Sequence, residues 1–272
     1  MKSTLVTFFY PNVKSFIFGL VASINEQSLL PNELIVFNDN MEGVEEELEE
    51  LKINFKIIQV KGTPFENRLE AFEFLKTLNT DYIIFQDADD LMGPKRIEVV
   101  VGKLKKHDLV VNDLSLMTYN GDLYRENIWS DRLKNNFKIN DQFINDKNII
   151  GLGNTSIKKN VLIDLNIVTA NREIYAADWF IFYQLLKDHT INAIFTSETS
   201  TYYRQHQNNI STLHKTSNEA LERLIKVRKA HYEGLESAGY DMKLESLNLK
   251  NIKLNSITNT LESRHDSFWW ET

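Results

Sequence analysis

Residues 80 to 97 read Thr-Asp-Tyr-Ile-Ile-Phe-Gln-Asp-Ala-Asp-Asp-Leu-Met-Gly-Pro-Lys-Arg-Ile, and the rest of the chain is interpreted relative to this stretch. Tyr82 to Gln86 is a short apolar run between polar residues, which predicts a buried strand. Three acids follow it directly: Asp87, Asp89 and Asp90. Pro94 then opens an apolar pattern with helical spacing, which predicts a helix over 94–106. The acids therefore lie between the carboxyl end of a strand and a helix, where open α/β sheets bind ligands.

The acid cluster has a functional and a structural interpretation. Carboxylates this close repel one another, so a hard divalent cation with oxygen ligands is their natural partner. Aspartate is also common in turns and at helix N-caps, so a single aspartate here would need no function. Three acids directly after an apolar strand favour a role linked to a metal or a phosphate.

Up to residue 112, strand patterns alternate with helical patterns. The predicted strands are Leu5–Phe9, Glu33–Phe37, Phe55–Val60, 82–86 and Asp108–Val111. Between them lie a helix with one apolar face from Val13 to Ile24, a short glutamate-rich helix within 42–51, a helix over Phe65–Leu75 and the helix over 94–106. This alternation indicates an α/β fold with a mostly parallel sheet and helices on both faces.

After residue 112 the pattern changes. Leu114–Tyr119 and Leu123–Glu126 flank Asn120-Gly121, which predicts a β-hairpin. Residues 151–157 form a small-residue loop that leads into a strand but lacks the spacing of a Walker loop or a dinucleotide fingerprint. Asp178 precedes an apolar helical stripe, and from position alone it could equally be a helix-capping acid. Two late strands are predicted at 193–195 and 200–203.

The last part of the chain is helical in pattern. Leu221, Leu224, Ile225, Tyr232 and Leu235 predict a long amphipathic helix, and 244–261 a second one. We expect a domain over 1–215, with halves 1–112 and 113–215, and a helical extension over 216–272. The extension should pack on the domain or on a second copy, which would make a homodimer. Trp269 and Trp270 fit a packing role or a contact patch equally well.

The bulk composition excludes several classes of protein. The 272 residues carry a net charge of −7, whereas a nucleic-acid partner would favour a basic face. The absence of cysteine excludes disulfides, cysteine-based zinc sites and a thiol nucleophile. No apolar run is long enough for a membrane span, and the N-terminal apolar stretch is too short for a signal peptide. We therefore expect a cytoplasmic protein, compatible with peripheral association at the inner face of the membrane.

Together these motifs resemble the family 2 glycosyltransferases of the GT-A fold over roughly residues 3 to 212. The more specific matches are Asp87-Ala-Asp-Asp90 with its downstream proline and Tyr203-Arg-Gln-His-Gln-Asn-Asn-Ile-Ser211. Matches at Thr7–Asn12, Val36–Asp39, Arg68, Gly153–Ser156 and Ala177-Asp178 keep the family's order. Three positions depart from the family pattern. Asn38 replaces the first of two acids, Ala177 replaces a glutamate, and Asn67-Arg68 is a blurred Ala-Arg-Asn signature.

The resemblance implies a Rossmann-like, mostly parallel sheet with a small antiparallel element on the acceptor side. It also implies roles for matched residues: Asp178 as general base; Asp39, Arg68, Asp87 and Tyr10 around the nucleotide; Asp89 and Asp90 at a Mn²⁺ or Mg²⁺ ion; Arg204 and His206 by the diphosphate in a closing loop. The implied donor is a nucleotide-diphosphate sugar, with a UDP-sugar expected first. The implied acceptor is a saccharide or a lipid-linked molecule, in bacterial surface polysaccharide or glycoconjugate synthesis.

The implied chemistry suits these residue types. A divalent cation held by a carboxylate and the phosphates would stabilise the diphosphate leaving group. One carboxylate on the opposite face of the sugar would deprotonate the acceptor, and a single displacement would invert the anomeric centre.

Three alternatives stay open at this stage. A nucleotidyltransferase would usually carry a glycine-rich basic loop after the first strand, where this chain has Phe9-Tyr-Pro-Asn-Val-Lys14. A phosphatase of the aspartyl-nucleophile type would have its acids after the first strand instead of the fourth. A domain that binds a nucleotide sugar without transferring it is compatible with the Asn38 and Ala177 departures.

Overall fold

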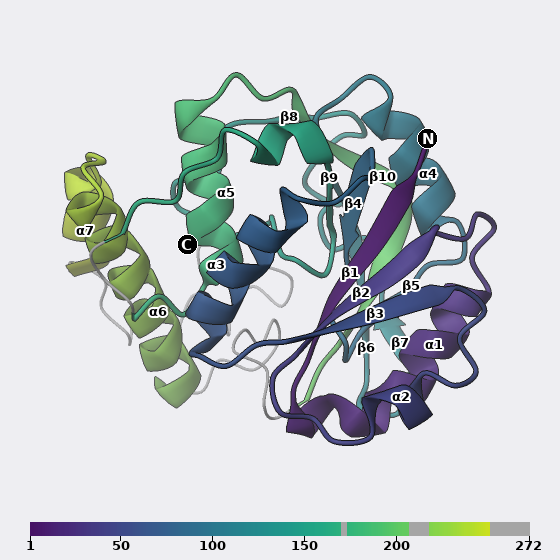
Figure 1. Cartoon of the computed structure of the whole chain (residues 1–272). Helices are drawn as coiled ribbons and strands as arrows, with labels where there is room; N and C mark the ends of the chain where they lie inside the picture. The colour runs from purple at the N-terminus through teal and green to yellow at the C-terminus, as the bar shows by residue number, and fades with distance from the viewer. Residues whose placement is uncertain (170–172, 207–217, 251–272) are drawn as a thin grey trace.

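The computed structural model of the chain describes residues 1–169, 173–206 and 218–250, and a 10-stranded sheet lies at its centre (Figure 1). The strands of the sheet are β1 Ser3–Phe9, β2 Glu33–Asn38, β3 Asn54–Gln59, β4 Tyr82–Phe85, β5 Leu91–Met92, β6 Leu109–Met117, β7 Leu123–Arg125, β8 Lys138–Ile139, β9 Thr155–Lys158 and β10 Ala193–Arg204. The helices are η1 Pro11–Phe16, α1 Ile17–Asn25, α2 Val44–Glu47, α3 Pro64–Leu75, α4 Arg96–Leu104, η2 Lys159–Leu162, α5 Ala177–Asp188, α6 Asn218–Ser237 and α7 Lys243–Lys250.

The sheet is parallel on its N-terminal side and mixed beyond it. Its strands follow the order β3-β2-β1-β4-β9-β6-β10-β5, and the first four are parallel to one another. β9 then pairs antiparallel with both β4 and β6, and β6 pairs parallel with β10. The predicted α/β fold with a mostly parallel sheet is confirmed. The insertion of β9 between β4 and β6 was not predicted, because it depends on a pairing across more than 40 residues of sequence.

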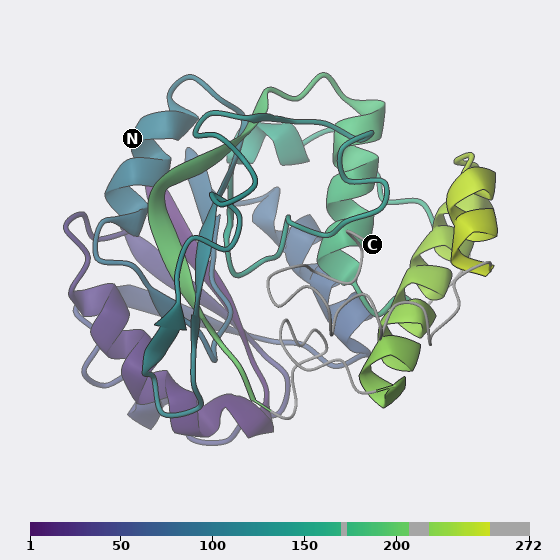
Figure 2. The same cartoon turned by 180° about the vertical axis from the view of Figure 1, so that it is seen from behind.

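Helices cover both faces of the sheet, as the alternating pattern predicts. Ile17 and Leu20 of α1 pack with Ile97 and Val100 of α4 in one apolar cluster. Aromatic residues of α3 and α5 belong to the other cluster, in which the ring centroids of Phe72 and Phe182 lie 6.0 Å apart. Figures 1 and 2 show α3 and α5 on one side of the sheet and α1 and α4 on the other.

Several predicted element boundaries are wrong. The strand at 108–111 and the first hairpin strand at 114–119 form one strand, β6, whose pairing with β7 confirms the hairpin. The helix expected over 94–106 begins only at Arg96, because Pro94 and Lys95 lie in the preceding turn. The helix expected within 42–51 is the single turn α2, and β5 was missed.

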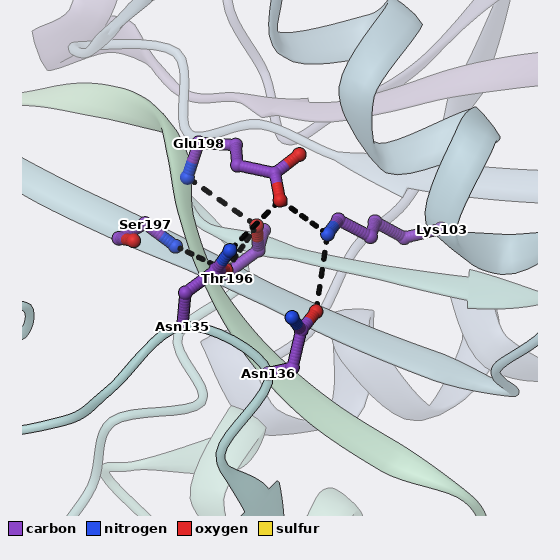
Figure 3. Close-up of polar contacts among 6 residues, drawn as sticks. All are labelled: Lys103, Asn135, Asn136, Thr196, Ser197 and Glu198. Atoms are coloured by element: carbon purple, nitrogen blue, oxygen red, sulfur yellow. Dashed lines mark hydrogen bonds and ion pairs between the residues drawn. The ribbon is translucent and has the colours of Figure 1, made fainter.

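The two late strands predicted at 193–195 and 200–203 are also one strand, β10. Its pairing with β6 shifts register between Thr196 and Ser200. Side chains fix this bulge: the Nζ of Lys103 lies 2.5 Å from Glu198 Oε1, and the amide of Asn135 donates to the same oxygen (Figure 3). The Oδ1 of Asn135 in turn accepts from Thr196 and Ser197. A one-residue slip would reverse the face of every later side chain, so the bulge sets the orientation of the strand's end.

The C-terminal helices α6 and α7 lie beside α5 in both views (Figures 1 and 2). His231 of α6 stacks on Trp179 of α5 with ring centroids 3.8 Å apart. An added Cβ at Gly234 would lie 2.5 Å from Ile174 Cδ1, so a glycine permits this close approach. The extension therefore packs on the domain, while the division at 215 stays a prediction. Its later part, with Trp269 and Trp270, lies outside the described residues.

Candidate active site

A cavity of about 610 Å³ opens where β1, β2 and β4 end. Eight of the predicted site residues line it: Tyr10, Asp39, Arg68, Asp87, Asp89, Asp90, Asp178 and His206. The ninth, Arg204, is not among the lining residues. Its backbone N–H donates to the side chain of Asp90, and its guanidinium donates to the backbone carbonyl of Asp89. Residues from 10 to 206 in the sequence thus meet in one place because parallel strands end at the same edge of the sheet.

One end of the cavity is built by Asp39 and the first turns of α3. A capping box of Thr63 and Glu66 starts α3, which aims Asn67 and Arg68 into the cavity. The Asn67 amide donates to Asp39 Oδ2 over 3.0 Å, and no described partner reaches the buried Asn67 Oδ1. The guanidinium of Arg68 lies 3.5 Å above the centre of the Phe8 ring. Aromatic surface, carboxylate and amide together suit a planar, hydrogen-bonding group such as a nucleobase.

The Asn38 departure does not touch the cavity. The Asn38 amide donates to the carbonyl of Met41, and its Oδ1 accepts from the Met41 N–H, 3.0 Å in each case. Asn38 therefore closes the turn that follows β2. Asp39 alone presents a carboxylate from this turn.

The carboxylates of Asp87 and Asp90 lie close to each other in the wall of the cavity. An added Cβ at Gly153 would lie 2.8 Å from Asp87 Oδ2 and 3.2 Å from Asp90 Oδ2, so both carboxylates point to this glycine. Burial, and then the neighbouring Asp89, raises the pKa of Asp87 to about 7 and the pKa of Asp90 well above its ordinary range. The Arg204 N–H donates to Asp90 Oδ1 over 2.8 Å, whereas the buried Asp90 Oδ2 has no described partner. A cluster of buried carboxylates with raised pKa values favours the binding of a cation.

Of the two predicted cation ligands, Asp89 lies beside His206, and Asp90 has one oxygen bound by the Arg204 N–H. Asp89 Oδ2 lies 2.8 Å from His206 Nε2, and the His206 ring stacks on Phe16. Among the described residues, no group of three His, Cys, Asp or Glu side chains could hold a metal ion. Magnesium that is bound with nucleotides is usually held by one or two carboxylates, with phosphate oxygens and waters as the remaining ligands. The donor set therefore fits a cation that arrives with a diphosphate.

Arg204 differs from the expected loop residue. It is the last residue of β10, and its guanidinium donates to the carbonyls of Asp89 and Tyr119. It connects the loop that carries Asp87, Asp89 and Asp90, called the acid loop below, to the β6–β7 hairpin turn. Residues 207–211 of the matched segment lie outside the described part of the chain.

Asp178 lies in the first turn of α5 on the wall formed by residues 148–152 and α5. Its Oδ1 accepts from the Trp179 N–H over 2.8 Å and from the Asn148 amide over 3.3 Å. Burial raises the pKa of Asp178, and these hydrogen bonds partly offset that rise. A carboxylate with a raised pKa is a stronger base than one in water, provided that it is ionised.

Tyr10 lies at the end of β1 between Arg68 and the acid loop. Burial, together with Asp89 and Asp87, raises the pKa of its phenol, so Tyr10 stays neutral and acts only by hydrogen bonding or stacking.

Sequence reasoning missed several residues that shape the site. In the sequence, Asn67 is only part of a blurred Ala-Arg-Asn signature, and Asn148 lies in a segment without hydrophobic periodicity. Arg96, one residue after Lys95, has the sequence signature of a surface position but is fully buried beneath the acid loop. Leu224, Val227 and Arg228 line the cavity from α6, at the spacing of one helical face. That spacing was the only signal that could have found them.

The comparisons with known proteins agree with the fold. The model of glycosyl transferase family 2 matches residues 5–165, more than half of the chain. Two S. aureus crystal structures are similar in fold. TarS 1-349 has 16% identity and a TM-score of 0.62 over 98% of this chain and 80% of that one. TarS 1-349 in complex with UDP-GlcNAc has 17% identity and a TM-score of 0.64, over 97% and 76%. No curated protein sequence matches the chain.

Proposed function

Because the chain belongs to glycosyl transferase family 2, we propose that it is an inverting, metal-dependent enzyme that moves a sugar from a UDP-sugar to an acceptor hydroxyl. The supporting observation is that one cavity combines a site suited to a nucleobase, the acid loop and, apart from them, the buried carboxylate of Asp178. The solved TarS complex that this fold resembles carries UDP-GlcNAc, which makes UDP-GlcNAc the first donor to test. The proposed biological setting is the synthesis of a bacterial surface polysaccharide or glycoconjugate.

In this proposal the donor lies along the charged wall. Asp39 accepts a hydrogen bond from the N3–H of uracil, and the Arg68 guanidinium on Phe8 lies beside the base. Asp87 accepts from a ribose hydroxyl. The diphosphate then lies over Asp89, with His206 next to that carboxylate.

Asp89 and His206 would hold the cation, and a bound divalent cation would stabilise the negative charge on the leaving diphosphate. The described part of the chain has no helix that combines the length and the apolar surface needed to cross a bilayer. We propose as acceptor a saccharide or the head group of a lipid-linked molecule.

Asp178 provides the base. Its carboxylate takes the proton of the acceptor hydroxyl while the acceptor oxygen forms a bond to the anomeric carbon. The bond from that carbon to the diphosphate oxygen breaks, and its electron pair leaves with the nucleotide. A single displacement inverts the configuration. The apolar wall of Trp179 and Leu224 lies on the same side as Asp178 and is the proposed acceptor side.

Donor binding and metal binding should be coupled through Asp89. We expect UDP and Mn²⁺ together to raise the melting temperature more than the sum of their separate effects, because each provides ligands for the other. At a ligand concentration 100 times Kd, the stabilisation should be about 2.7 kcal/mol. Asp89→Asn should remove most of the joint effect. Scanning fluorimetry with UDP, GDP, dTDP and CMP, with and without MnCl₂, measures it.

Asp81→Asn is the matched control, because Asp81 is exposed at the opposite end of β4. Its ligand response should equal that of the wild type. Equal stabilisation of the wild type and Asp89→Asn would remove Asp89 from the cation site. A wild type that no nucleotide stabilises would contradict the proposed donor and favour a different phosphate-handling reaction.

A further inference from the structure

Arg96 is a fully buried arginine beneath the acid loop, with 0% of its surface exposed. Its guanidinium donates to Asn112 Oδ1 over 2.7 Å, to Gln86 Oε1 over 2.6 Å and to the carbonyl of Phe85 over 2.7 Å. Phe85 and Gln86 are the two residues before Asp87. Arg96 does not line the cavity, so any effect on a ligand must act through the residues above it.

The three acceptors of Arg96 are uncharged oxygens, so among the described residues no carboxylate is in direct contact with its positive charge. Burying a charge without an ionic partner costs free energy, and an apolar residue of similar volume would often be as stable there. Burial lowers the pKa of Arg96 to about 9, which leaves it protonated at neutral pH. Packing alone therefore does not explain an arginine at this position.

The charges that Arg96 faces belong to the acid loop. Asp87 and Asp90 oppose the lowering of its pKa, and Arg96 in turn favours the ionised form of Asp87. The cavity also holds Asp89 and Asp178, so four carboxylates surround the place where an anionic diphosphate would bind. Arg68 and Arg204 also interact electrostatically with carboxylates of this cluster. A buried cation in low dielectric acts over a longer range than a surface one, because little water screens it.

We propose that Arg96 is a positioning residue whose buried charge offsets the acid loop and so permits a nucleotide diphosphate to bind. This inference rests on the proposed function, since it requires a diphosphate ligand. The arginine also fixes geometry: Asn112 donates to Thr201, whose hydroxyl donates to the carbonyl of Gly153. If the charge of Arg96 matters, Arg96→Lys and Arg96→Gln should differ in their effects. If only its hydrogen-bond geometry matters, they should have the same effect.

Arg96→Lys keeps the charge and loses the fork geometry of the planar guanidinium, which donates several hydrogen bonds at once. Arg96→Gln keeps hydrogen-bonding capacity and loses the charge. The binding of UDP and of inorganic pyrophosphate to the purified full chain, measured by titration calorimetry with and without MgCl₂, separates them. We expect Arg96→Gln to weaken both ligands on the order of tenfold, as a unit charge at roughly 10 Å would with an effective dielectric constant near 20. Arg96→Lys should stay within about twofold of the wild type.

Lys105→Gln is the matched control, because it removes one positive charge from the exposed end of α4 and should change neither affinity. Gln86→Glu tests the same idea with Arg96 in place. It adds a carboxylate against the guanidinium, which cancels its charge, and should weaken both ligands as Arg96→Gln does. This variant decides the question even if the Arg96 variants do not fold.

Two results would overturn the proposal while leaving the proposed function intact. One is wild-type affinity for both ligands in folded Arg96→Gln or in Gln86→Glu. The other is an equal loss in Arg96→Lys and Arg96→Gln, which would assign the effect to the fork geometry. A wild type that binds neither UDP nor pyrophosphate would contradict the proposed function and this inference together.

Discussion

Asp178→Asn should lower kcat by about 10²-fold or more and leave the affinity for UDP within about twofold of the wild type. The substitution keeps an Oδ1 that can accept from the Trp179 N–H, so the first turn of α5 retains its hydrogen bond. It removes the ability to take a proton, because the asparagine amide cannot act as a base. Release of UDP from a UDP-sugar measures kcat, and calorimetry measures UDP binding.

Asp188→Asn is the control on the same helix, because Asp188 is exposed at its far end and contacts Tyr240 instead of the cavity. It should turn over as the wild type does. If Asp178→Asn also turns over normally, Asp178 is a helix-terminus acid and takes no part in the reaction. A wild type that binds UDP but releases none from any sugar donor would favour the binding-only alternative.

Gly153→Ala should lower kcat/KM on the order of 10²-fold, the size of effect that a shift of about 1 Å at a reacting group produces. The new Cβ would lie 2.8 Å from Asp87 Oδ2 and 3.2 Å from Asp90 Oδ2. Asp90 has little room to move, because Arg204 holds its other oxygen. The acid loop must therefore shift, and Asp89 with it. Steady-state kinetics with a UDP-sugar and Mn²⁺ measures the loss.

Gly102→Ala is the control for this substitution, because no atom lies within 4 Å of the added Cβ. In a helix this change should stabilise the protein by up to about 1 kcal/mol and leave turnover unchanged. Normal kinetics for Gly153→Ala would show that the acid loop tolerates the displacement, and that its observed geometry does not matter for catalysis.

The sequence was most informative where local pattern and topology agree. Asp87, Asp89 and Asp90 follow an apolar run, and the end of a strand is visible from the composition of neighbouring residues alone. Asp39 and Arg68 could be placed near them because parallel strands of one sheet end at the same edge. The amphipathic face of α6 was predicted from its spacing in the same way.

The parts that could not be predicted depend on distant pairing. β10 reads as two strands because its bulge interrupts the apolar pattern, and only the contacts of Lys103, Asn135 and Glu198 reveal one continuous strand. Arg96 was missed because the three oxygens that accept its hydrogen bonds come from two different strands. Burial of a charged residue is set by such tertiary partners and leaves no local signal.

Asn38 departs from the family pattern, and its structural role is visible only from its contacts. Its side chain closes a turn, so the absence of an acid there leaves the cavity intact. Ala177 is different because it lines the cavity, and the wall beside Asp178 therefore lacks a second carboxylate. Catalysis in this chain would depend on Asp178 alone.

The stereochemistry of the released sugar shows whether this enzyme transfers the sugar by a single displacement. Without an acceptor, water can take the place of the acceptor hydroxyl, with Asp178 as its base. Proton NMR of the first sugar released from α-linked UDP-GlcNAc and related UDP-sugars then reports the anomer before it equilibrates. A single displacement predicts that the β-anomer appears first, together with UDP. Initial release of the α-anomer, or no UDP release from any donor, would contradict an inverting transferase.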